Sequence, residues 1–189
     1  MNTNKIISTV VFMVLVGAVV YFIPSKKSAQ APSAPEVVQN KPAFDPKNAT
    51  YEINGKSVTL VNGVSETEAA PGSASKITTR YFGNEAKGDL NNDGKDDMAF
   101  LISQSGGGSG LFYYAVVALA TGDGYKMTNA FFVGDRIAPQ TTEINTSAQE
   151  LRVNFAERKP GEPMTARPSM GVTLYLKVTP EGVLTGLMQ

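Results

Sequence analysis

Hydrophobic residues recur at every second position in several short stretches of the chain. In residues 150–155 the hydrophobic positions are Leu151, Val153 and Phe155, and residues 172–178 repeat the pattern. Side chains of a β-strand point alternately to its two faces, so a period of two is typical of a half-buried strand. Both stretches therefore predict strands with one face on a core and the other in solvent.

Other stretches are hydrophobic without alternation. Residues 111–120 are almost continuously apolar and aromatic, which predicts a central strand covered on both faces. Residues 77–82 and 98–102 predict two further strands, the second one short and buried. After a turn at residues 121–124, residues 125–133 are expected to return antiparallel to the central strand.

A β-hairpin is predicted at the start of this region. Residues 51–53 and 56–61 flank the dipeptide formed by Asn54 and Gly55. Asn-Gly favours a type I′ turn, because both of its residues adopt positive φ readily. We therefore expect the folded part of the chain to begin close to residue 49.

Stretches rich in polar residues, Gly or Pro predict the connections between these strands. The predicted connections are residues 62–75, 106–110, 134–140 and 157–171. No helical period is visible beyond residue 48, so residues 49–189 predict an all-β fold, either a single sandwich or an open barrel-like domain. Loops 106–110 and 157–171 form the expected recognition surface, since long loops on rigid sheets often carry binding residues.

The amino-terminal part of the chain has a different character. After a polar flank, residues 1–5, residues 6–23 contain no charged side chain. As a helix they would be about 27 Å long, close to a hydrocarbon core of ~30 Å, which predicts a transmembrane anchor. A cleaved signal peptide is the alternative. Residues 24–48 contain five Pro among Ser, Ala, Gln and Lys, and predict a semi-extended linker.

Composition excludes several classes of chemistry. The chain of 189 residues contains neither Cys nor His, which removes disulfides, thiol catalysis, Cys- or His-bound zinc and Ser-His-Asp catalysis. The net charge is zero, but residues 1–48 carry five Lys against two acids, and the remainder carries twelve basic against fifteen acidic side chains. Because the body lacks a basic surface, no nucleic-acid partner is expected.

Candidate chemistry is concentrated in residues 89–97, between two predicted strands. Alternate positions of this segment offer oxygen atoms, from Asp89, Asn91, Asp93, the Lys95 backbone carbonyl and Asp97. Ca²⁺ takes about six to eight oxygen ligands, and Gly94 permits the sharp turn that brings them together. Four acids in nine residues would repel one another without a cation. These five residues are therefore the predicted ligands of Ca²⁺; a solvated Asn/Asp/Gly turn is the alternative.

The pattern Asp-x-Asn-x-Asp-Gly-x-x-Asp, preceded by Gly88 and followed by an apolar strand, resembles the calcium loops of FG-GAP and VCBS-type repeats. The resemblance covers residues 88–102 and implies the same ligand positions. FG-GAP repeats build propellers of several blades, whereas this chain has a single such loop, so the resemblance implies the loop and not a propeller. The body also looks like short exported prokaryotic proteins of unknown function.

Together these features predict a membrane-tethered, extracytoplasmic, calcium-binding β module at the cell surface or in the periplasm. Its expected role is non-catalytic binding or adhesion, with a glycan, a cell-wall polymer or a protein as the candidate ligand. One alternative is a carboxylate-dependent hydrolase of cell-envelope glycans, for which the available acids are Asp135, Glu143, Glu157 and Glu162. A structural envelope protein or an inhibitor is the other alternative. No residue is assigned a catalytic role.

Overall fold

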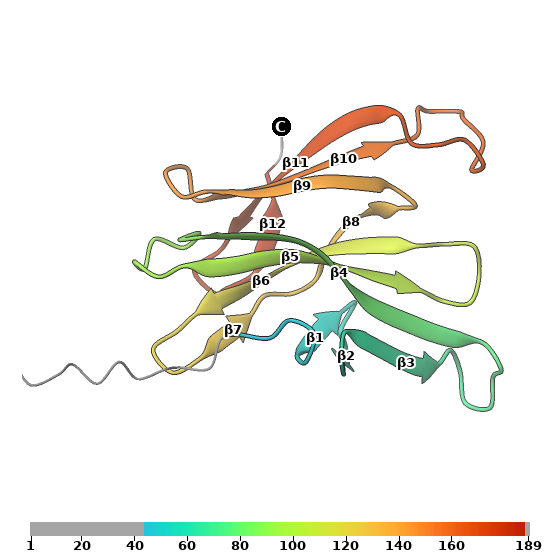
Figure 1. The fold of residues 1–189 in the computed structure, drawn as a ribbon, viewed down its shortest axis with the longest axis horizontal. Helices are drawn as coiled ribbons and strands as arrows, with labels where there is room; N and C mark the ends of the chain where they lie inside the picture. The colour runs from blue at the N-terminus through green and yellow to red at the C-terminus, as the bar shows by residue number, and fades with distance from the viewer. Residues whose placement is uncertain (1–43, 188–189) are drawn as a thin grey trace, which may run out of the picture. The chain divides into compact units, whose positions relative to one another are not determined.

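The computed structural model describes residues 44–187, and the fold of this part of the chain is all-β (Figure 1). The predicted all-β fold is therefore confirmed for this part of the chain. Within it we find no helix whose length and apolar character would let it cross a membrane. The predicted flank 1–5, the predicted anchor 6–23 and most of the predicted linker 24–48 lie outside the described residues.

Within residues 44–187, twelve strands form three antiparallel sheets. A two-stranded hairpin contains β1 (Thr50–Ile53) and β2 (Lys56–Thr59). The six-stranded sheet contains β3 (Val64–Glu68), β4 (Lys76–Gly88), β5 (Asp97–Ser105), β6 (Phe112–Ala120) and β7 (Tyr125–Met127), with β8 (Phe131–Asp135) also paired to β6. The four-stranded sheet contains β9 (Ala138–Asn145), β10 (Glu150–Glu157), β11 (Met170–Val178) and β12 (Leu184–Gly186).

The two larger sheets curl around a first hydrophobic cluster and form a half-barrel (Figure 1). Alternate residues of β6, from Tyr113 to Leu119, contribute to this cluster together with buried residues of β10, β11 and β12. Residues on the other face of β6, such as Val116, belong to a second cluster together with Tyr51 and Ile53 of β1. The central strand is therefore buried on both faces, as its continuous hydrophobic sequence predicts.

The predicted hairpin is confirmed in both its strands and its turn. Strands β1 and β2 pair antiparallel, and the residues between them, Asn54 and Gly55, have φ values of 51° and 73°. Positive φ at both central positions is the feature that a type I′ turn requires. The turn could be predicted because it depends on two adjacent residues and not on distant packing.

Two of the predicted connections and one predicted strand are wrong in part. Residues 62–75 contain the edge strand β3, whose sequence is polar because much of it faces solvent. Residues 134–140 hold the end of β8 and the start of β9, where Pro139 is tolerated because β9 lies at a sheet edge. The return strand predicted over residues 125–133 is interrupted, so β7 and β8 pair with β6 separately.

Antiparallel connectivity brings four connections to the same end of the two larger sheets. They join β4 to β5, β6 to β7, β9 to β10 and β11 to β12, and residues from all four line a single pocket. The two loops expected to form a recognition surface, 106–110 and 157–171, follow β5 and β10 at the opposite end (Figure 1). The candidate calcium loop and the expected recognition loops are therefore separated by the length of a strand.

Candidate metal site

The candidate loop begins and ends on paired strands of the six-stranded sheet. Gly88 at the end of β4 pairs with Asp97 at the start of β5. A Cβ atom on Gly88 would lie 3.0 Å from Cγ2 of Ile144 on β9, so the glycine allows the two sheets to approach each other here. Within the loop, Asn92 and Gly94 have φ values of 61° and 81°, a region that Gly and Asn tolerate best.

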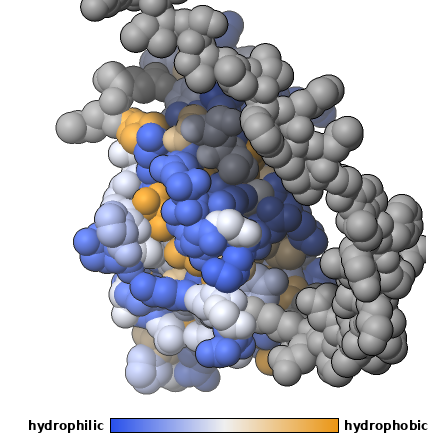
Figure 2. Space-filling model, turned by 90° about the vertical axis from the view of Figure 1, so that its left-hand side faces the viewer, coloured by the Kyte–Doolittle hydropathy of each residue, from blue (hydrophilic) through white to orange (hydrophobic). Residues whose placement is uncertain are grey.

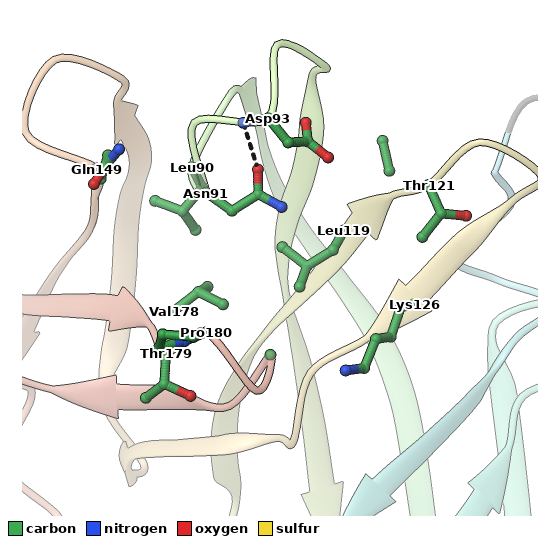
Figure 3. Close-up of a pocket in the computed structure, with 12 residues that line it drawn as sticks. Leu90, Asn91, Asp93, Leu119, Thr121, Lys126, Gln149, Val178, Thr179 and Pro180 are labelled. Atoms are coloured by element: carbon green, nitrogen blue, oxygen red, sulfur yellow. Dashed lines mark hydrogen bonds between the residues drawn. The ribbon is translucent and has the colours of Figure 1, made fainter.

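The first half of the loop is wound around the side chain of Asp89. Its Oδ1 accepts the backbone N–H of Asp93 at 3.1 Å, and its Oδ2 accepts that of Gly94 at 2.8 Å. Oδ1 of Asn91 also accepts the N–H of Asp93, at 3.1 Å (Figure 3). The carboxylate of Asp89 and the amide of Asn91 therefore both turn toward the interior of the loop, as ligands of a bound cation would.

Asp97, at the end of the loop, holds the start of the loop to the sheet. Its side chain is only 1% exposed, and both of its oxygens accept buried backbone N–H groups. Oδ2 accepts the N–H of Leu90 at 3.0 Å, and Oδ1 accepts that of Ala120 at the end of β6 at 2.8 Å. One carboxylate thus fixes the start of the loop to the neighbouring strand, and this role is not visible in the loop sequence.

The acids of the loop influence one another electrostatically. Burial raises the pKa of Asp97 above its ordinary value, and the nearby carboxylates of Asp93 and Asp89 raise it further, while its two backbone hydrogen bonds act in the opposite direction. Negative charges that raise the pKa of a carboxyl group disfavour its ionised form, and a divalent cation among them would reverse this effect.

The fourth predicted ligand, Lys95, also takes part in the loop through its side chain. Its backbone N–H donates to Oδ1 of Asp93 at 2.9 Å, and its ammonium lies 3.2 Å from Oδ2 of the same residue. Asp96, which breaks the alternate spacing of ligands, is exposed. Lys95 therefore neutralises one loop carboxylate in the structure.

The donor set fits calcium by its chemistry, because it consists of hard oxygen atoms on a tight turn. Each carboxylate oxygen has two acceptor positions, so the hydrogen bonds within the loop leave capacity for a metal. The side chains, however, do not form a finished cage: nowhere in residues 44–187 are three or more Asp or Glu placed together so that they could hold a metal ion. Calcium binding would require the Lys95 ammonium to leave Asp93. The exposed carboxylate of Asp93 would then turn toward the interior of the loop.

The acids considered for hydrolysis lie away from this end of the sheets or already have local partners. Asp135 at the end of β8 forms a 2.5 Å ion pair with Arg136, and this hydrogen bond lowers the pKa of Asp135. Glu143 accepts a hydrogen bond from Thr141 on the same strand, and Glu162 accepts the N–H of Lys159. A general acid needs a raised pKa in a cleft, so Asp135 has the opposite character.

A pocket of about 580 Å³, here called the loop-end pocket, adjoins the candidate loop. Asn91 and Asp93 line one side of it, and the other sides are lined by Lys126 on β7, Gln149 between β9 and β10, and Pro180 between β11 and β12 (Figure 3). The last three residues were not singled out from the sequence. The one signal in the sequence is that these residues lie in or next to every second connection, and antiparallel strands bring such connections to the same end of a sheet.

The face that carries these connections is mostly hydrophilic, with hydrophobic residues visible between the polar ones (Figure 2). Comparison with known proteins adds no family assignment: no family model, no curated protein and no solved structure matches the chain. The chemistry of the loop and of the adjoining pocket is therefore the basis for a functional proposal.

Proposed function

We propose that the chain is a membrane-tethered, extracytoplasmic β module whose loop 89–97 binds a calcium ion, and that its role is non-catalytic binding or adhesion. The ion would be held by Asp89, Asn91, Asp93, the Lys95 carbonyl and Asp97. Its role would be structural, because the loop supplies most of the oxygen atoms that calcium needs and leaves few positions for a substrate. The FG-GAP/VCBS-type pattern of the loop agrees with this proposal.

The observation that carries the proposal is the way the loop is organised around its own oxygens. Asp89 accepts two backbone N–H groups from the turn, and Asp97 joins the loop to β6 through the N–H of Ala120. An ion between these carboxylates would neutralise their repulsion and tighten the corner shared by β4, β5 and β6. Calcium binding is therefore expected to stabilise the six-stranded sheet.

The test is a thermal unfolding experiment on the full chain in detergent, with calcium and with a chelator. Extracellular calcium modules have dissociation constants of ~10⁻⁴–10⁻³ M, so about 1 mM calcium should stabilise the fold by roughly 0.4–1.4 kcal/mol. For a domain of this size we expect a rise in Tm of a few degrees. Asp89→Ala and Asp93→Ala should each abolish the calcium-dependent rise.

A matched control is Asp96→Asn, which removes a charge from the same loop without removing a proposed ligand. This variant should keep the calcium-dependent rise in Tm, because Asp96 is exposed and does not take part in the hydrogen bonds that organise the loop interior. Identical unfolding curves for the native chain in calcium and in chelator would refute the calcium assignment.

The membrane and extracytoplasmic parts of the proposal rest on residues 6–23, an uncharged stretch long enough to span a bilayer. Expressed with its native amino terminus, the chain should stay in the membrane fraction after alkaline extraction, and deletion of residues 1–23 should release it. Protease added outside intact cells or spheroplasts should digest the body. Recovery of a soluble chain whose amino terminus lies beyond residue 23 would instead favour a cleaved signal peptide.

A further inference from the structure

The loop-end pocket has the size and position of a ligand site. Its volume of about 580 Å³ lies within the range of ~300–1,000 Å³ that is usual for small-molecule sites. Four connections that are distant in sequence surround it, including the candidate loop and the turn that contains Gly182 (Figure 3). These connections end the strands of both larger sheets, so a rigid scaffold holds the pocket.

The floor of the pocket is hydrophobic and belongs to the core. Leu90 and Leu119 are 1% and 5% exposed and are members of the first hydrophobic cluster, and Val178 packs against that cluster. Because the same side chains hold the two sheets together, the floor is fixed before any ligand arrives. It offers a ligand a small apolar surface, and Pro180 extends this surface toward the rim.

The rim of the pocket is polar and presents both donors and acceptors. Asn91 and Gln149 contribute amide groups, Asp93 a carboxylate and Lys126 an ammonium group. The ammonium donates to the backbone carbonyl of Glu181 at 2.7 Å, which holds it at the rim and leaves further N–H groups for other acceptors.

Gly182 gives the ammonium group its space. A Cβ atom at this position would lie 2.9 Å from Nζ of Lys126, and the φ value of Gly182 is +84°. The positive φ is the stronger reason for a glycine in the β11–β12 turn, because the end of the Lys126 side chain could shift to make room for a Cβ atom.

From these features we infer that the loop-end pocket binds a neutral, hydroxyl-rich ligand of the saccharide class. The charged groups of the rim are already balanced, because the ammonium of Lys95 neutralises Asp93 and the charge of Lys126 acts on the nearby Glu181 carboxyl. A neutral ligand therefore suits the rim better than an anion or a cation. Hydroxyl groups both donate and accept, so they satisfy amides and charged groups alike, while the C–H face of a sugar ring packs on the leucine floor. A purely apolar ligand would bury the amide and ammonium groups without partners, which is costly.

This inference goes beyond the proposed calcium function and does not depend on it. Asn91 and Asp93 belong to both the loop and the pocket, but the floor, Lys126 and Gln149 are in place without a metal. Saccharide binding that survives a chelator would support the pocket and leave the calcium question to the unfolding experiment. Saccharide binding that requires calcium would support the pocket and show that the loop organises its rim.

The test is saturation-transfer NMR on the full chain in dodecylphosphocholine micelles, which carry no sugar. The probes are glucose, mannose, galactose and N-acetylglucosamine, each with calcium and with a chelator, and acetate and butanol serve as the anionic and apolar comparisons. We expect saturation transfer to the ring protons of at least one saccharide. The absence of transfer to all four saccharides, or stronger transfer to acetate or butanol, would overturn the inference.

Two variants assign the binding to the pocket. Lys126→Met keeps the aliphatic stem and removes the ammonium group, and it should weaken saccharide binding by about ten-fold or more, as expected for the loss of a charged hydrogen bond. Gln149→Asn withdraws the amide while suiting the positive φ of 51° at this position, so it should fold and bind more weakly. Lys56→Met, at an exposed site on β2, is the matched control. Equal affinity in both pocket variants and the control would refute the assignment to this pocket.

Discussion

At the scale of single residues, Asp97 has a more specific role than its place in a ligand pattern indicates. The sequence predicts it as the last oxygen ligand of the loop, and nothing local shows that it is buried. In the structure its carboxylate satisfies the N–H groups of Leu90 and Ala120, which would otherwise be buried without acceptors. Burial of this side chain depends on where β6 ends, so it could not be predicted from the loop alone.

The double hydrogen bond of Asp97 makes a prediction that is independent of calcium. In a chelator, Asp97→Ala should lower the free energy of unfolding by about 2 kcal/mol or more, because two buried donors lose their acceptor. Asp96→Ala, at the exposed neighbouring position, should change the free energy by less than about 0.5 kcal/mol. Urea denaturation followed by circular dichroism measures both values. Equal effects of the two substitutions would contradict the role assigned to Asp97.

At the scale of elements, the sequence predicts the strands whose hydrophobic pattern is complete and misses two edge strands, β3 and β9. Strand β6 is predicted because its residues are hydrophobic on both faces, and both clusters of the core use it. Strand β3 is missed because its five residues include two Glu and are largely exposed, so its pairing with β4 leaves little hydrophobic signal. Strand β9 is obscured at its start by Pro139, opposite which β10 has an irregular register.

The second hydrophobic cluster makes a prediction about how the β1–β2 hairpin is held on the six-stranded sheet. Phe100 is 0% exposed, and its ring lies 5.8 Å from the rings of both Tyr51 and Tyr81. Phe100→Ala should therefore cost about 3–5 kcal/mol of unfolding free energy, as large cavities in cores do.

Phe132→Ala is the comparison, because this ring is 50% exposed although it also contacts other aromatic rings. It should cost much less than Phe100→Ala in the same urea titration. Similar costs for the two substitutions would show that the hairpin does not form a core with the sheet.

At the scale of the whole described body, the arrangement of the sheets decides which predicted residues can act together. The sequence predicts an all-β fold and the five residues of the candidate metal site, but it does not decide between a sandwich and an open barrel. It also expects loops 106–110 and 157–171 to form the recognition surface, and strand direction places them at the end remote from the candidate loop. The residues beside the loop, such as Lys126 and Gln149, come together only through the register of four hairpins.

The most direct test of the calcium proposal is isothermal titration of Ca²⁺ into the metal-free full chain. We expect one ion to bind per chain with a dissociation constant of ~10⁻⁴–10⁻³ M, and we expect the binding heat to disappear when Asp89→Ala and Asp93→Ala are combined. The absence of binding heat in the native chain, or an unchanged titration in the double variant, would contradict the account.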